Sequence, residues 1–299
     1  MARPFIIFAD SFNENIGGLV AAHRLCHLLN ESGATAFMWP HRKPLFDPRR
    51  PVASGRLLYR WYRHAMQWPY VTPKGSRAPV ATVARLRDAI VVYPEIVNGN
   101  PLRSRRVVRW LLHKPGFHTG SFEYGPDDRF FFYQHAFNDP AINPEADNQL
   151  RVTWIRDDIY RQTNFGPRHG TCYILRKGKG RPLVHDLADS ILVDEMSHTE
   201  MAAVFNRVTA CISYDSYTMY SQFAALCGCD SIVVPEAGVS KEQWYPDPQD
   251  RLGVAYGFDD VEAARQSRPK LLPYLKAQER ETNRSVMDFI RKCERYFPE

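Results

Sequence analysis

Short apolar runs alternate with helical patterns along this chain of 299 residues, and the alternation begins twice. In the first half the apolar runs predict strands at Phe5–Ala9, Ala34–Trp39, Ala89–Tyr93, Arg129–Gln134 and Leu150–Ile155. A helical pattern between the first two strands ends at Gly33, and Arg105–His113 is predicted to form a second helix before Pro115-Gly116. Strands separated by helices form parallel sheets, so the first half is predicted to be an α/β unit.

The alternation restarts after the polar segment Tyr160–Gly170, which contains Gly166-Pro167 and is predicted to be a linker. The second series comprises predicted strands at Thr171–Leu175, Ser190–Val193, Ala210–Tyr214 and Ser231–Pro235, with helices at Thr199–Arg207 and Thr218–Cys227. From Asp259 onward the chain is predicted to be largely helical, with kinks at Pro269 and Pro273. We therefore expect domains at residues 1–160 and 170–265, a helical tail at 266–299, and a cleft between two doubly wound sheets.

The chain carries 39 lysines and arginines against 33 acidic residues, a formal net charge of +6. Such a surplus suits an anionic partner such as a nucleotide phosphate, a lipid phosphate, a membrane surface or nucleic acid. Ten of the cations lie in a basic insert at residues 41–85, where Asp47 is the single acid. This insert is either a solvated loop or an arm that faces an anion, and no nucleic-acid-binding module accompanies it.

The first apolar run, Phe5–Ala9, is too short for the core of a signal peptide, and no uncharged apolar run reaches the length of a membrane span. The six cysteines have no C-x-x-C spacing and lie mostly in apolar segments. We interpret them as reduced core thiols of a cytoplasmic protein.

Three segments carry residues suited to binding chemistry. The first contains Gly17-Gly18, between the first strand and the first helix. Paired glycines let the backbone approach a ligand closely, and the helix that follows presents free N–H groups to an anion. The alternative is a tight turn that only needs a positive φ.

The second segment runs from Arg176 to Arg181 with the sequence R-K-G-K-G-R, directly after a predicted strand. Arg176, Lys177 and Lys179 are suited to grip a diphosphate at the carboxyl end of a parallel strand. The spacing differs from that of a P-loop, and the alternative is a solvated basic hairpin.

The third segment comprises two helix starts. Ser197 and His198 are candidate donor-binding residues at the first of them. Ser197-His198-Thr199-Glu200 also fits a capping box, which is a structural alternative for Ser197 and Glu200 but not for His198. The stretch from Tyr214 to Ser221 offers hydroxyls, a carboxylate and helix N–H groups to a phosphate and a ribose. Its candidate donor-binding residues are Tyr214, Asp215, Ser216, Thr218 and Ser221, although Ser216 could be only an N-cap.

The order of these segments resembles the donor-binding domain of GT-B glycosyltransferases. The resemblance rests on the basic strand end, the S-x-x-E helix start and the helix ending in A-A-L-C-G-C before Ile232-Val233-Val234-Pro235. In the first half, Asn15-Ile16-Gly17-Gly18 stands where these enzymes have their diphosphate-facing glycine loop. The segment from Val91 to Pro101 is similar to a subgroup linked to bacterial surface polysaccharides. The resemblance implies two Rossmann-like domains facing across a cleft and a C-terminal helix that returns to the first domain.

The resemblance also implies a function, with one departure. It implies transfer of a sugar from a nucleotide-sugar co-substrate to a growing surface glycan or lipid-linked glycan, without other cofactors. Many retaining members carry E-x7-E, whose second glutamate binds the donor ribose, but Phe223 stands at that position here, beside Gln222. The ribose contact is therefore absent or rebuilt from Tyr214, Asp215, Thr218 or Ser221.

A leaving nucleoside diphosphate must be stabilised as its negative charge develops. The chain has no D-x-D motif, so we expect Arg176, Lys177, Lys179 and helix N–H groups to do this without a metal. Glu95 is the candidate base for the acceptor hydroxyl, with Asp10 in reserve, and the alternative for Glu95 is a solvated loop acid. His23 and His27 have the spacing of zinc ligands, but the general base of H-E-x-x-H is missing, so we expect a surface or flanking role.

Two other functions remain open: a nucleotide-sugar epimerase on the same fold, and a non-catalytic subunit that binds nucleotide sugars. Trp61, Tyr62, Trp68 and Tyr70 lie among the cations of the basic insert, a combination that suits a membrane interface. We therefore expect salt-sensitive peripheral contact with the inner face of the membrane, without insertion. The alternative is a folded insert whose aromatic side chains pack into the first domain.

Overall fold

The computed structural model describes residues 3–298, which form two compact units. The first unit contains the chain up to Thr153 together with the residues from Arg280 onward, and the second is Trp154–Glu279. Each unit is built on its own five-stranded sheet, in which every strand pair is parallel. The prediction of two Rossmann-like α/β units with parallel sheets is therefore confirmed.

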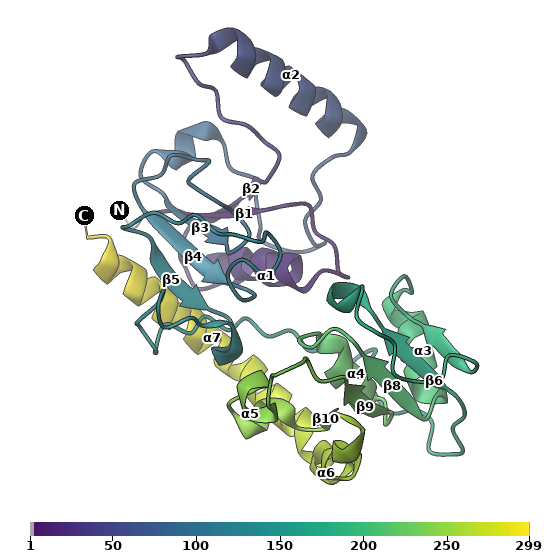
Figure 1. The fold of residues 1–299 in the computed structure, drawn as a ribbon. Helices are drawn as coiled ribbons and strands as arrows, with labels where there is room; N and C mark the ends of the chain where they lie inside the picture. The colour runs from purple at the N-terminus through teal and green to yellow at the C-terminus, as the bar shows by residue number, and fades with distance from the viewer. Residues whose placement is uncertain (1–2, 299) are drawn as a thin grey trace. The chain divides into compact units, whose positions relative to one another are not determined.

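The first sheet has the strand order β2-β1-β3-β4-β5 (Figure 1). The strands are β1 (Phe5–Ala9), β2 (Ala36–Pro40), β3 (Ile90–Pro94), β4 (Val107–Leu111) and β5 (Arg129–Phe132). The chain moves from β1 to β2 on one side and then returns past β1 to β3 on the other. The direction of the crossovers reverses between β1 and β3, and this switch point is where ligands bind in doubly wound sheets.

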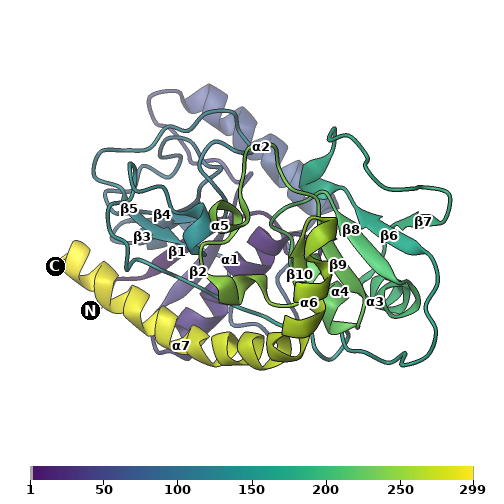
Figure 2. The same cartoon turned by 60° about the horizontal axis from the view of Figure 1, so that its bottom comes forward.

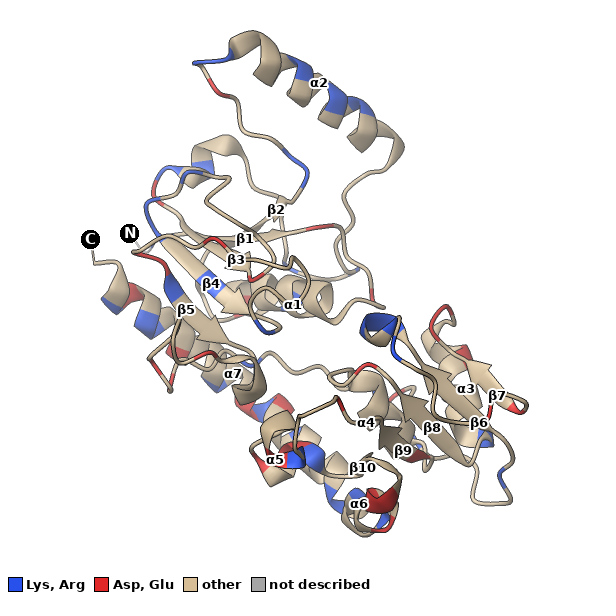
Figure 3. Ribbon diagram, viewed as in Figure 1, with Lys and Arg blue, Asp and Glu red and all other residues tan. Residues whose placement is uncertain are grey.

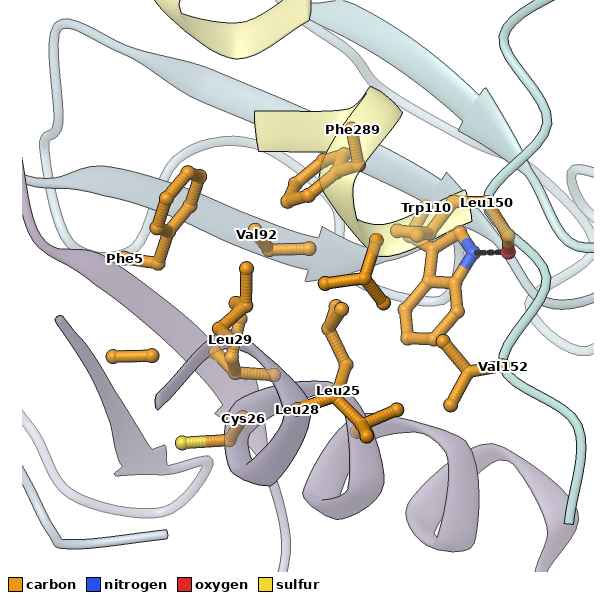
Figure 4. Close-up of a cluster of buried hydrophobic side chains, with 14 of the residues drawn as sticks. Phe5, Leu25, Cys26, Leu28, Leu29, Val92, Trp110, Leu150, Val152 and Phe289 are labelled. Carbon is orange, nitrogen blue, oxygen red and sulfur yellow. Dashed lines mark hydrogen bonds between the residues drawn. The ribbon is translucent and has the colours of Figure 1, made fainter. Parts of the chain in front are cut away.

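Two helices cover one face of this sheet (Figure 4). Helix α1 (Gly17–Glu31) contributes Leu25 and Leu29, which lie i and i+4 on one side of the helix. The C-terminal half of α7 (Leu271–Tyr296) contributes Phe289, whose ring centroid lies 5.4 Å from that of Phe5 on β1. The indole of Trp110 in this core donates a hydrogen bond to the carbonyl of Leu150, at 3.0 Å.

The second sheet has the order β10-β9-β8-β6-β7 (Figure 2). Its strands are β6 (Thr171–Ile174), β7 (Ser190–Leu192), β8 (Ala210–Ser213), β9 (Asp230–Val233) and β10 (Val254–Tyr256). Its helices are α3 (His198–Arg207), α4 (Met219–Leu226), α5 (Lys241–Trp244) and α6 (Val261–Ser267). Counted within its own unit, the order repeats that of the first sheet, and the switch point lies between β6 and β8.

The predicted helix at Arg105–His113 is wrong, because this segment contains strand β4. All five residues of β4 are buried, and they pair with β3 on one side and β5 on the other. The β-branched residues Val107 and Val108 favour a strand. Arg109 does not interrupt the buried strand, because its guanidinium donates hydrogen bonds to Asp128, Val97 O and Gly99 O.

Two further predictions about regular structure are wrong. The segment Leu150–Ile155 forms no strand: Arg151 N donates instead to the Ser285 hydroxyl of α7, at 2.9 Å. Pro273 does not kink the C-terminal helix. It lies in the first turn of α7, where backbone N–H groups have no intrahelical acceptor, so its missing N–H costs no hydrogen bond. Pro269 lies in a 3-10 turn, Arg268–Lys270, that separates α6 from α7.

The basic insert contains a helix that the sequence analysis did not predict, α2 (Pro51–Gln67). Ser54 is the only buried residue of α2, and Tyr59, Tyr62 and the following Trp68 are exposed. Tyr70 behaves differently, since it packs against the first core and its hydroxyl donates to Ala9 O at 3.3 Å. The alternative of packing into the first domain is therefore wrong for Tyr62 and Trp68, whereas Trp61 is half-buried, with the Lys43 ammonium 5.6 Å from its ring centroid.

All six cysteines are buried and unpaired, as predicted. Burial raises the pKa of the Cys26 thiol to about 12. Across residues 3–298, no helix combines the length and the apolar character needed to cross a bilayer.

Candidate functional site

A cationic turn lies at the switch point of the second sheet. The residues Arg176–Gly178 form a 3-10 turn that is separated from the end of β6 by Leu175 alone and lies next to the carboxyl end of β8. Arg176 has φ = 37°, a left-handed conformation that is uncommon for a residue with a side chain. The carboxylate of Asp194 holds this turn, because it accepts hydrogen bonds from Leu175 N at 3.0 Å and Arg176 N at 2.7 Å.

The turn also lies close against β8. An added Cβ on Gly178 would lie 2.1 Å from the carbonyl oxygen of Tyr214, so only glycine fits there. Arg181 clamps the segment from its other end, donating to Tyr214 O at 2.7 Å and to Pro235 O at 2.6 Å. Arg181 is thus engaged with the strand ends, whereas the side chains of Lys177 and Lys179 are exposed.

We expect Gly178→Ala to lower the free energy of unfolding by about 1–3 kcal/mol, because the methyl group must displace the end of β8. Urea unfolding of the purified protein measures the effect. Gly17→Ala is the matched control, since no heavy atom lies within 4 Å of a Cβ built there. Equal unfolding midpoints for the two variants would show that the turn can move away from Tyr214.

Asp215 is a buried carboxyl beside this turn. Burial raises its pKa, and the nearby Lys177 and Arg176 act in the opposite direction. Its Oδ1 accepts a hydrogen bond from Tyr217 N at 3.2 Å. The neighbouring Ser216 is also buried, and its carbonyl accepts from the indole of Trp244 at 2.7 Å.

Tyr214 is fully engaged within the second unit. Its hydroxyl accepts from Val184 N at 2.8 Å and is hydrogen-bonded to His185 Nδ1 at 2.7 Å. The other ring nitrogen of His185 is hydrogen-bonded to the Ser190 hydroxyl, and burial lowers the pKa of this imidazole. Sequence reasoning identified Tyr214 as a candidate but missed His185, because nothing in the sequence pairs two residues 29 positions apart.

The start of α3 contains both a structural capping residue, Ser197, and a candidate ligand-binding residue, His198. Ser197 and Glu200 form the predicted capping box, with Ser197 N donating to Glu200 Oε2 at 2.9 Å. His198 is buried, and its Nδ1 is hydrogen-bonded to the Tyr160 hydroxyl at 2.6 Å. The His198 ring lies 5.8 Å from the ring of Tyr220, which also carries the Arg176 guanidinium at 4.1 Å from its centroid.

Helix α4 begins next to these groups. Thr218 is its N-cap, accepting from Tyr220 N at 3.3 Å, so the alternative of Ser216 as the N-cap is wrong. The Ser221 hydroxyl in the first turn is buried and has no hydrogen-bond partner within residues 3–298. Phe223 stacks on Tyr160 with ring centroids 4.1 Å apart and an interplanar angle of 8°, so it belongs to the hydrophobic core.

In the first unit, two candidates flank the switch point of the sheet. Asp10 follows β1, is partly exposed and lies 3.7 Å from Arg42. Glu95 follows β3 and is only 5% exposed, so the alternative of a solvated loop acid is wrong. Its Oε2 accepts from Leu112 N at 3.0 Å, and its backbone carbonyl accepts from the Tyr124 hydroxyl at 2.9 Å.

Gly17 and Gly18 are the first two residues of α1. Neither has a positive φ, so the alternative of a tight turn that needs one is wrong. The N-cap Ile16 makes no side-chain hydrogen bond, and the space around Gly17 is open. The helix N-terminus is thus accessible at the same edge of the sheet as Asp10, the edge to which β1 leads.

The two histidines with zinc-like spacing have other partners. His23 is completely buried rather than at the surface, its Nε2 is hydrogen-bonded to Asp10 O at 3.0 Å, and burial lowers its pKa. His27 Nδ1 accepts from Arg77 N at 3.0 Å. Within the described part of the chain, no group of three or more His, Cys, Asp or Glu side chains could hold a metal ion.

Comparisons with known proteins reach this chain through structure alone. No family model matches it, and no curated protein does. Similar solved structures include T4 phage BGT in complex with its UDP-glucose substrate, with a TM-score of 0.45, 9% identity and 100% coverage of both chains. The glycotransferase of kitacinnamycin has a TM-score of 0.41 and 11% identity, with 100% of both chains covered.

A third similar structure is a putative UDP-N-acetylglucosamine 2-epimerase from Listeria monocytogenes. Its TM-score is 0.40 at 7% identity, and the match covers 100% of this chain and 97% of the other. Structural similarity at this level does not support a conclusion about the activity of the chain. A proposal about activity therefore has to rest on the residues at the two switch points.

Proposed function

We propose that the chain is a GT-B-type glycosyltransferase that moves a sugar from a nucleotide-activated donor to an acceptor, without a bound metal. The observation that carries the proposal is the cationic turn Arg176–Gly178 at the switch point of the second sheet. A turn held rigid by Asp194 is suited to bind the diphosphate of a donor, because its positive charges need not be reorganised when the ligand arrives.

In this proposal the donor occupies the second unit. Arg176, Lys177 and Lys179 bind the diphosphate, together with the N-terminus of α4. The Ser221 hydroxyl and the Asp215 carboxyl are the favoured partners for donor hydroxyls. Ser221 has no other partner within residues 3–298, whereas the Tyr214 hydroxyl is already engaged by His185 and Val184. His198, at the start of α3, completes the set, and Ser197 and Thr218 act through their caps.

The first unit would supply the acceptor side. Glu95 is the proposed base for the acceptor hydroxyl, with Asp10 in reserve, because each follows a strand that borders the switch point. Gly17 and Gly18 are further proposed donor-binding residues, because they leave the N-terminus of α1 open to a phosphate. As the bond to the leaving diphosphate breaks, the cations of the turn stabilise the charge that develops on it.

The acceptor in this proposal is a growing bacterial surface glycan or a lipid-linked glycan. The resemblance to the surface-polysaccharide subgroup supports this class of acceptor. A lipid-linked acceptor would bring the first unit to the inner face of the membrane, and the cations of residues 42–85 are suited to that contact.

The experiment is a turnover assay with a panel of nucleotide sugars, in which released nucleoside diphosphate is measured with and without glycan acceptors. We expect release that depends on the acceptor, persists in excess chelator and is lost in Glu95→Gln. Turnover that a chelator abolishes and manganese or magnesium restores contradicts the metal-free proposal. Isomerised sugar without an acceptor supports an epimerase instead, and tight binding without any turnover supports a non-catalytic subunit.

A further inference from the structure

Helix α2 presents a row of arginines and no acidic residue (Figure 3). Arg56, Arg60 and Arg63 lie at i, i+4 and i+7, and therefore on one face of the helix. All three are exposed, and none makes a hydrogen bond, an ion pair or a ring contact within residues 3–298. Their charges are thus available to an external anionic partner.

The part of the helix surface beside this row is apolar and uncovered. Val52, Tyr59, Tyr62 and Met66 lie at i, i+7, i+10 and i+14, which places them along one side of the helix. Their side chains are between 57% and 68% exposed, so the first unit does not cover this side. A soluble helix normally turns such residues toward its own core, and a helix that exposes them has another surface to contact.

Four other cations of the basic insert have partners within the first unit. Arg42 pairs with Asp10 at 3.7 Å, Arg77 pairs with Glu31 at 3.0 Å, and Lys43 donates to Ala81 O at 3.0 Å. The guanidinium of Arg85 lies over the Phe37 ring at 5.1 Å. Arg49, Arg50 and Lys74 are exposed as well, so α2 is distinguished from the rest of residues 42–85 by the exposed apolar row beside its arginines.

We propose that α2 docks on the surface of an anionic bilayer and lies in the plane of the interface. The apolar side with Val52, Tyr59, Tyr62 and Met66 enters the boundary between headgroups and acyl chains, to a depth of about 5–10 Å. The arginine row remains at the level of the lipid phosphates. This proposal differs from the expectation of contact without insertion, because an apolar side of this extent gains free energy only when it leaves water.

The choice of a bilayer over a protein partner follows from charge complementarity and side-chain chemistry. A row of arginines beside an apolar row with tyrosines and methionine matches an interface that is anionic above and apolar below, because the long arginine side chains reach the phosphates while the apolar row is buried. The inference concerns a surface of the first unit alone and does not depend on sugar transfer. The membrane-docking proposal can therefore be tested independently of the proposed function.

The test is sedimentation of the full chain with phosphatidylcholine vesicles that contain or lack phosphatidylserine, at low and high salt. We expect binding only to the anionic vesicles, and weaker binding as salt rises. Neutralising three arginines in R56Q/R60Q/R63Q should lower the partition coefficient on the order of 100-fold. The matched control R105Q/R207Q/R280Q removes the same charge from exposed sites elsewhere and should bind nearly as well as the wild type.

A second variant, Y59S/Y62S/M66S, tests the insertion of the apolar side. This variant keeps every charge, so we expect it to retain some binding to anionic vesicles at low salt. If insertion occurs, high salt abolishes this remaining binding completely, whereas a fraction of the wild-type protein stays bound at high salt. Circular dichroism checks that both variants remain folded, as expected for exposed positions. Equal recovery of wild-type protein from neutral and anionic vesicles overturns the proposal. A dimer that this second variant converts to monomer would instead assign the surface to a second copy of the chain.

Discussion

Replacing Arg176 and Lys179 together by alanine is expected to lower the affinity for a nucleoside diphosphate by at least about 100-fold, because each loses a charge-assisted contact to phosphate. The fold should be retained. The backbone N–H of Arg176 that binds Asp194 is unchanged by the substitution, and Arg181, Gly178 and Asp194 still hold the turn against β8.

Isothermal titration calorimetry with the nucleoside diphosphate alone measures this effect without an identified sugar or acceptor. The matched control is Arg207→Ala with Lys270→Ala, which removes two exposed cations of the second unit away from the switch point. Unchanged affinity in the Arg176 and Lys179 variant would remove these residues from the site. Equal losses of affinity in both variants would show that the effect comes from the change in net charge alone.

Replacing Arg109 by methionine is expected to lower the free energy of unfolding by about 3–5 kcal/mol, because breaking a buried ion pair leaves an uncompensated charge. The Arg109 side chain is completely buried and that of Asp128 is 8% exposed, with 2.6 Å between Nε and Oδ2. The substitution also removes the hydrogen bonds that Arg109 donates to Val97 O and Gly99 O, both at 2.5 Å. The segment after Glu95 therefore loses an anchor.

Chemical denaturation of Arg109→Met, Asp128→Asn and the double variant resolves the contribution of the pair. The double variant should be more stable than the sum of the single losses predicts, because it leaves no unpaired charge. Arg105→Met is the control, since Arg105 is an exposed arginine just before the same strand and its loss should cost less than about 0.5 kcal/mol. Losses that simply add would mean that the ion pair makes no net contribution.

The parts of the fold that sequence reasoning predicted are those in which one periodicity dominates. Strand β1 is a continuous apolar run, and α1 repeats its leucines at helical spacing. The failure at β4 has a physical cause: the Arg109 charge within an apolar segment indicates an exposed helix face unless its partner Asp128 is known. The failure to predict helix α2 has a different cause. The apolar side chains of this helix are exposed and pack against no hydrophobic core, so the helix lacks the buried face by which helices are normally recognised.

The candidate site was predictable in its location but not in its internal partners. Both switch points collect residues that follow strands, so Asp10, Glu95 and Arg176 could be selected from strand ends alone. Asp194 and His185 could not, because their roles depend on contacts across loops that no local pattern encodes. The capping box at Ser197 needs no such contact, and it was predicted together with both of its hydrogen bonds.

Helix α7 contributes to both units, since Leu271 and Leu275 pack in the second while Val286, Phe289 and Cys293 pack in the first. During synthesis the first unit therefore cannot complete its core until residue 293 has left the ribosome. The second unit, which is contained in Trp154–Glu279, can close earlier although it is encoded later. This reverses the usual order in which the N-terminal domain of a nascent chain folds first. Phe5 in the first sheet cannot pack against Phe289 until the C-terminal part of α7 has been synthesised.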